Sequence, residues 1–180
     1  MIMTYREAYK KYKNDYGINN AISNKEIFKI GRGLYSDKKN IDPMIVYSKK
    51  YQNAVITLDS AFYYYKLTDY IPDKVYLAIA RHARPIKDKN VVVFYIDDTI
   101  IESGKTTVKI DNEDVNIYDK ERLLVELIRK RNQIPFDYYK EIITAYRKIS
   151  DKLDMAKLEK YMALFKNEAN IGDALLREVF

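Results

Sequence analysis

Residues 54–74 read AVITLDSAFYYYKLTDYIPDK, and this stretch decides the fold of the central part of the chain. It begins with an apolar, β-branched Val-Ile pair, which is typical of a buried strand. Thr57 then fits a helix N-cap, and Asp59 falls in the first turn, where a carboxylate interacts favourably with the positive helix end. The helix must end before Pro72, because the residue before a proline disfavours helical backbone angles. Since a second apolar run follows at 75–80, the stretch predicts a strand, a short helix, a tight loop and a strand.

The stretch contains no nucleophile–base pair and no cluster of metal ligands, so its residue types alone predict a core unit without chemistry. The order of its residues nevertheless resembles the T-x-x-S-A-(L/F)…L-T-D-x-x-P signature of the AbiEi antitoxins. These proteins are the antitoxin halves of AbiE-type, or type IV, toxin–antitoxin systems. The residues that match the signature are Thr57, Ser60, Ala61, Leu67, Thr68, Asp69 and Pro72.

Length and composition favour an ordered protein of one domain, or of one domain with a small module. The chain has 180 residues, of which 47% are hydrophobic, so a core is possible and disorder is not expected. It has no cysteine, which excludes disulfides and thiolate metal sites. No apolar run approaches the roughly 20 residues of a membrane span, and the N-terminus lacks the apolar core of a signal peptide. We therefore expect a cytoplasmic protein with no membrane contact and no cofactor.

Positive charge is concentrated at the N-terminal end. The net charge is +6, and residues 1–40 hold nine Lys or Arg against four Asp or Glu. A short basic segment attached to a nearly neutral body is typical of a protein that binds a polyanion, although a solvated surface is an equally ordinary reading.

Residues 1–40 have the pattern of two short helices followed by a hairpin. Thr4 and Glu7 form a potential capping box at the start of the first helix, and Asp15 is the expected cap of the second. A hairpin follows, and we expect the glycines on both sides of Arg32 to supply its positive φ angles. This order predicts a winged helix-turn-helix, with a small α+β cap on the main domain as the alternative.

In a winged helix-turn-helix the second helix enters the major groove and the hairpin contacts the DNA backbone or the minor groove. The side chains expected to face bases are Tyr16, Asn19 and Asn20, because an amide suits a bidentate contact with adenine. Those expected to contact phosphate are Lys29, Arg32, Lys38 and Lys39. The run FKIGRGLYSD, at residues 28–37, also resembles the wing of AbiEi antitoxins, which implies repression of the protein's own operon.

The central residues predict further strands and one alternative chemistry. Residues 91–96 are apolar throughout, so we expect a strand buried on both faces, and residues 106–118 predict a hairpin. Asp97 and Asp98 follow the buried strand, and carboxylates at a strand end can hold Mg²⁺ for nuclease chemistry. No lysine stands at a convincing catalytic spacing, so a metal-dependent nuclease is the lesser alternative.

The last third of the chain predicts helices that pack on the sheet. Asp119 is a potential cap for the first, and Pro135 suits the first turn of the second. A third is expected at 153–165, and Gly172 is expected to separate off a last segment at 173–180. The order Y-D-x-E-R-x-L that begins at Tyr118 again resembles AbiEi C-terminal domains.

These observations predict an α+β protein with a winged helix-turn-helix at 1–40 and a mixed α/β domain with a helical tail at 41–180. The resemblance implies a non-enzymatic antitoxin that counteracts a nucleotidyltransferase-like toxin encoded nearby and represses its operon by binding promoter DNA. Whether the two proteins form a direct complex is left open. The main alternative is a DNA-binding transcriptional regulator without a toxin partner, and a protein-interaction module is a further one.

Overall fold

The computed structural model describes all residues, 1–180, and has the expected α+β class with mixed sheets. The chain forms two compact units. The N-terminal unit comprises Met1–Gln52 with Lys109–Val115, and the C-terminal unit comprises Asn53–Val108 with Asn116–Phe180. The first unit therefore extends beyond the boundary expected at residue 40. None of the helices is both long and apolar enough to cross a membrane.

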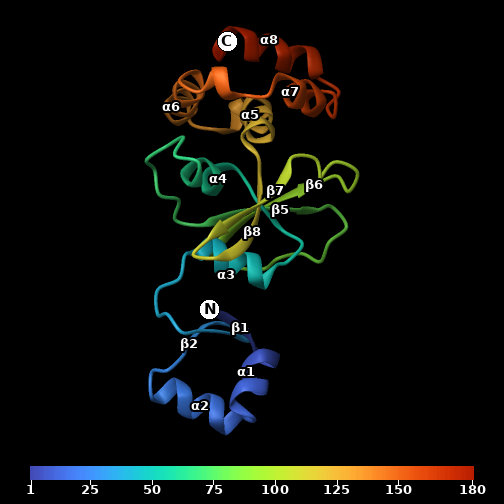
Figure 1. Ribbon diagram of the computed structural model, residues 1–180. Coiled ribbons are helices and arrows are strands. Elements are labelled where there is room, and N and C mark those ends of the chain that lie inside the picture. The colour runs from blue at the N-terminus through green and yellow to red at the C-terminus, as the bar shows by residue number, and fades with distance from the viewer. The chain divides into compact units, whose positions relative to one another are not determined.

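The N-terminal unit combines a three-stranded antiparallel sheet, in the order β1-β3-β2, with three short helices (Figure 1). Its elements are β1 Ile2–Thr4, α1 Tyr5–Tyr12, α2 Asp15–Ser23, β2 Phe28–Gly31, β3 Leu34–Ser36 and α3 Pro43–Lys50. The first strand thus pairs with the second strand of the hairpin, so the sheet brackets the helix pair in sequence.

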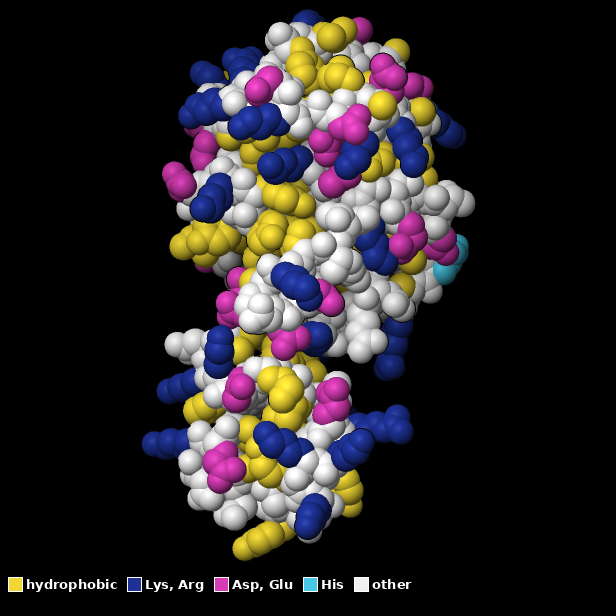
Figure 2. Space-filling model, in the orientation of Figure 1, with side chains coloured by type: hydrophobic (Ala, Val, Ile, Leu, Met, Phe, Trp, Pro, Cys, Tyr) yellow, Lys and Arg dark blue, Asp and Glu magenta, His cyan; other side chains and the backbone are white.

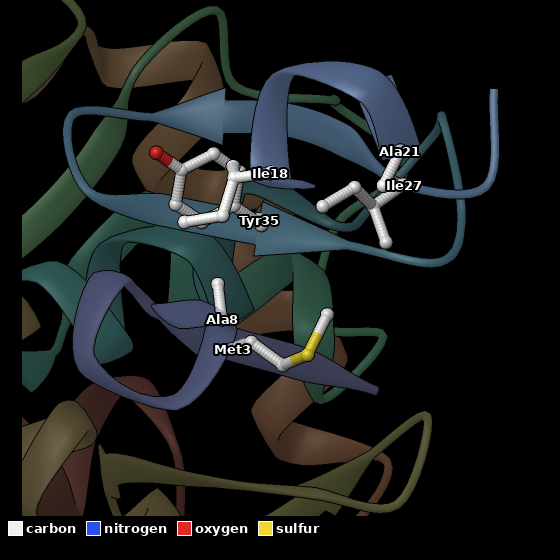
Figure 3. Close-up of a cluster of buried hydrophobic side chains, with 6 residues drawn as sticks. All are labelled: Met3, Ala8, Ile18, Ala21, Ile27 and Tyr35. Carbon is white, nitrogen blue, oxygen red and sulfur yellow. The ribbon is translucent and has the colours of Figure 1, made fainter. Parts of the chain in front are cut away.

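A small apolar core joins the sheet to α1 and α2. Its buried members are Met3, Ala8, Ile18, Ala21, Ile27 and Tyr35, drawn in Figure 3, with Tyr12 and Ile22 packed against them. They come from β1 and β3, from α1 and α2, and from the loop that follows α2. Ala8 and Tyr12 of α1 and Ile18, Ala21 and Ile22 of α2 therefore fix the helix pair against the sheet, whereas Tyr5 and Tyr9 of α1 remain exposed.

The tip of a distant hairpin completes the N-terminal unit. One carboxylate oxygen of Glu113 accepts a hydrogen bond from the backbone N–H of Ile2, at 3.1 Å, and the other pairs with Lys49 of α3, at 2.9 Å. The N-terminal unit therefore includes residues of α3 and of this hairpin tip in addition to residues 1–40.

The C-terminal unit is built on a mixed five-stranded sheet in the order β6-β5-β4-β8-β7. Its strands are β4 Val55–Ile56, β5 Val75–Ala80, β6 Val91–Ile96, β7 Lys105–Ile110 and β8 Glu113–Tyr118, the last two carrying the hairpin tip assigned to the first unit. Helix α4, Leu58–Tyr64, follows β4, so residues 54–80 form the predicted strand, helix, loop and strand. Thr57 is the N-cap residue, as expected, but its side chain makes no capping hydrogen bond.

Two predictions for this unit are wrong. β6 is an edge strand whose single neighbour in the sheet is β5, and at this margin only Val91 is buried and Tyr95 is 47% exposed. Gly172 does not divide two segments but lies inside α8, Glu168–Glu178. The buried residues Ile171 and Leu175 on either side of it outweigh the low helix propensity of a single glycine.

Helix α5, Lys120–Arg129, lies at the centre of the helical part, among α6 (Phe136–Arg147), α7 (Met155–Met162) and α8 (Figure 1). Asp119 caps α5, as predicted. The side chain of Arg122 is fully buried and pairs with Glu126 at 2.9 Å. Gly104, at φ +82°, packs directly against Arg122, so the Y-D-x-E-R order serves to build this core.

Candidate nucleic-acid interface

A tight turn joins α1 to α2. Lys13 adopts a φ of +71°, and the side chain of Asn14 caps α2 by accepting the N–H of Gly17 at 2.7 Å. The sequence predicted Asp15 as the cap of this helix, and the structure shows that the cap is Asn14 instead. A Cβ on Gly17 would lie 2.2 Å from the carbonyl oxygen of Tyr12, so glycine is required for the two helices to approach.

The start of α1 has the predicted capping box. The backbone N–H of Glu7 donates to the Thr4 hydroxyl, and a carboxylate oxygen of Glu7 accepts from the Thr4 backbone N–H at 2.7 Å. Hydrogen bonds from the Thr4 backbone and hydroxyl lower the pKa of Glu7. This carboxylate is thereby committed to the helix end.

The outer face of α2 carries the three side chains expected to face bases. Tyr16 is 79% exposed, and Asn19 and Asn20 are exposed, while Ile18 and Ala21 on the opposite face are buried. Neither asparagine side chain forms a hydrogen bond within the protein, so both amides are available to a ligand. One helix therefore presents two amides and a phenol together.

The hairpin β2–β3 turns through Arg32 and Gly33. Gly33 has a φ of +70°, but Gly31 does not adopt a positive φ and instead pairs with Leu34 after a register shift, which corrects the expectation for that glycine. Lys29 and Arg32 are exposed and form no ion pair. The hairpin thus projects two unpaired cations.

Tyr5 connects the hairpin turn to the start of α2, a link that the local sequence pattern did not predict. Its backbone N–H donates to the carbonyl of Gly33 at 2.7 Å, and its hydroxyl donates to Asp15 at 2.7 Å. The hydrogen bond to Asp15 raises the pKa of Tyr5. The turn that carries Arg32 and the N-terminal end of α2, with Tyr16, therefore belong to one connected surface.

The carboxylates of residues 1–40 leave the Lys and Arg side chains of this segment unneutralised. Glu7 is held by the capping box, Asp15 accepts from Tyr5, and Asp37 binds the N-terminal ammonium at 2.6 Å. Lys38 forms only an exposed pair with Asp111, at 3.7 Å, and Lys39 forms none. Figure 2 shows Lys and Arg side chains projecting into solvent from the N-terminal unit.

The signature residues lie in the C-terminal unit, and most are buried. Thr57, Ser60, Ala61, Leu67 and Thr68 are each at most 5% exposed. The hydroxyl of Ser60 accepts the N–H of Tyr76, and that of Thr68 donates to Glu141.

Their surroundings favour a structural role for the buried members. Leu67, Thr68 and the exposed Asp69 also line a groove of about 420 Å³ against α6, and Pro72 lies half-buried beyond it.

Asp97 and Asp98 lie just after β6. Asp97 accepts hydrogen bonds from the N–H and hydroxyl of Thr99, at 3.0 and 2.7 Å, and the first of these chiefly lowers its pKa. Residues 101–104 form a turn, and Glu102 pairs with Lys105. No group of three or more His, Asp or Glu side chains is arranged to hold a metal ion.

Comparison of the sequence with models of known protein families and with curated proteins finds no match.

Proposed function

We propose that the protein binds promoter DNA through its N-terminal unit and acts as the antitoxin and autorepressor of a type IV toxin–antitoxin pair. The observation that carries the DNA-binding part is the outer face of α2, with Tyr16, Asn19 and Asn20 exposed on a helix that follows a tight helix–helix turn. In helix-turn-helix modules the second helix reads base edges in the major groove, with its N-terminal residues foremost.

The hairpin and the charge distribution support the same proposal. A strand that pairs with the second strand of a terminal hairpin, with two helices between them in sequence, is an arrangement that suits a winged helix-turn-helix. Lys29, Arg32 and Lys39 have no carboxylate partner, so their charges are available to phosphate. Tyr5 keeps the hairpin turn beside the reading end of α2.

The antitoxin part rests on the resemblance in the C-terminal unit. Most of the residues that carry it are buried in the strand, helix and loop of residues 54–80. On this resemblance we assign opposition to a nucleotidyltransferase-like toxin to this unit, without a catalytic role. A stand-alone regulator with no toxin partner is the second candidate, and the neighbouring open reading frame separates the two.

The test of DNA binding is fluorescence anisotropy with the region upstream of the gene, at several salt concentrations. Affinity should fall as salt rises, because phosphate contacts release counterions. Arg32→Ala should reduce the salt slope by about one, and Asn20→Ala should lower affinity for the operator by about 1–3 kcal/mol while sparing nonspecific DNA. The matched control is Arg84→Ala, an exposed arginine of the C-terminal unit. Absence of binding at low salt by the full-length protein refutes the repressor.

The test of the antitoxin part is growth rescue from the neighbouring toxin, beside a promoter reporter. Because α3 belongs to the first unit, the suitable fragment is 53–180. We expect this fragment to rescue growth and to lose repression. If it is folded by circular dichroism and fails to rescue, the division of labour between the units is wrong.

A further inference from the structure

A second cationic site lies in the C-terminal unit, in a groove of about 350 Å³ beside the start of α8. The groove is lined by three arginines and three asparagines, namely Arg129, Arg131, Arg177, Asn132, Asn167 and Asn170. Asp173 is the single carboxylate in the lining, and Ile128 and Ile171 supply an apolar part. Three guanidinium groups around one hollow repel one another, so an anion in the groove would relieve that repulsion.

The guanidinium of Arg129 is held in place from two sides. It donates to a carboxylate oxygen of Glu126 at 2.7 Å and lies 3.6 Å from the centroid of the Phe165 ring. The other oxygen of Glu126 pairs with the buried Arg122 at 2.9 Å. Two guanidinium groups therefore share one carboxylate, and a net positive charge remains beside the groove.

The other two arginines retain free donors. Arg131 reaches Glu178 at 3.4 Å with one nitrogen only, and the Nε of Arg177 donates to the backbone carbonyl of Asp173 at 3.1 Å. The Arg177 contact leaves both terminal nitrogens of its guanidinium free to bind phosphate in a bidentate manner, whereas Arg131 uses its Nη1 on Glu178 and keeps its other nitrogens free. The N-cap of α8, Asn167, makes no side-chain capping hydrogen bond, so its amide is free to contact a ligand, and Glu168 is the acidic residue of the first turn of this helix.

The lining matches one class of ligand. Guanidinium forks bind phosphate oxygens, and asparagine amides can both donate to and accept from the edge of a nucleobase. The volume falls at the lower end of the range for pockets that hold small molecules. We propose that this groove binds a nucleoside phosphate. The site is independent of the proposed DNA-binding surface, which belongs to the other unit.

The test is isothermal titration calorimetry of the full-length protein with ATP, GTP, CTP and UTP at low salt. At least one of the four should bind with a Kd below about 1 mM. Arg177→Ala and Arg131→Ala should each weaken that binding by about tenfold or more, since each removes a charge-assisted hydrogen bond. Arg177→Lys should recover part of the affinity, and Arg84→Ala, in the exposed 81–90 loop, should change nothing. The side chain of Arg177 is exposed, so the fold should persist, and Asn170→Ala provides a second exposed position.

Four outcomes overturn the proposal. The first is that no nucleotide binds at millimolar concentration. The second is that binding is unchanged when Arg177→Ala and Arg131→Ala are combined. The third is that a short single-stranded oligonucleotide binds more tightly than any nucleotide and depends on these arginines in the same way. Inorganic phosphate alone should bind more weakly than the nucleotide, and equal affinity would also contradict the proposal. Operator binding should be unchanged in the groove variants, which distinguishes failure of this site from failure of the DNA-binding surface.

Discussion

Replacing Gly17 with alanine should destabilise the N-terminal unit, although helix propensity alone predicts the opposite. An alanine in a helix interior is favoured over glycine by about 1 kcal/mol. The added Cβ would lie 2.2 Å from the carbonyl oxygen of Tyr12, however, where ordinary contact begins at 3.4 Å. That oxygen belongs to the backbone and cannot rotate away, so α1 and α2 must separate. Overpacking of this kind costs about 1–3 kcal/mol, and we take the upper end because a main chain must move.

The net loss expected is about 2 kcal/mol, which corresponds to roughly 10 °C in the melting temperature of a small domain. The matched control is Gly172→Ala in α8, where the added Cβ would meet only the sulfur of Met162, at 3.8 Å. With no clash to oppose it, helix propensity should stabilise α8 by up to about 1 kcal/mol.

Hydrogen exchange measured by mass spectrometry on peptides from α2 and α8 reports each unit separately. Protection should fall in α2 of the first variant and rise in α8 of the second. Equal gains at both positions would refute the close approach of α1 and α2, and with it the turn on which the proposed DNA-binding face depends.

Two further predictions concern pH and catalysis. The pKa of Glu7 is lowered in the folded protein, so its capping box contributes stability above the pKa of the unfolded chain, and that contribution is lost as the pH falls through the folded value. Glu7→Gln should therefore make the stability of the protein fall less steeply with decreasing pH, as followed by circular dichroism between about pH 6 and pH 3. Equal slopes for the variant and the wild type would contradict this. Asp97→Ala and Asp98→Ala should leave rescue from the toxin intact, and divalent-metal-dependent cleavage of DNA or RNA that disappears in these variants would show a nuclease instead.

Local patterns in the sequence predicted most of the elements correctly. The capping box at Thr4 and Glu7, the cap at Asp119 and the strand–helix–loop–strand of residues 54–80 depend on neighbours within a few positions, and the structure has all of them. The hairpin at residues 28–36 was equally local, and only the conformation of one of its glycines differed.

Features that depend on partners distant in sequence could not be predicted this way. The apolar run at 91–96 predicts a strand but does not show whether that strand lies inside the sheet or at its edge. Its position at the edge depends on the strand order of the whole sheet. A glycine such as Gly172 is typical of a helix end, but the helix continues through it because Ile171 and Leu175 are buried.

The sequence by itself determined the α+β class, the concentration of charge before residue 40 and the exposed face of the second helix, because periodicity and charge are properties of the chain alone. Only the tertiary structure decided that Glu113 completes the N-terminal unit, that Tyr5 ties the hairpin turn to α2, and that three arginines, Arg129, Arg131 and Arg177, meet at one groove. The physical reason is that these contacts join residues far apart along the chain, and packing of whole elements brings them together.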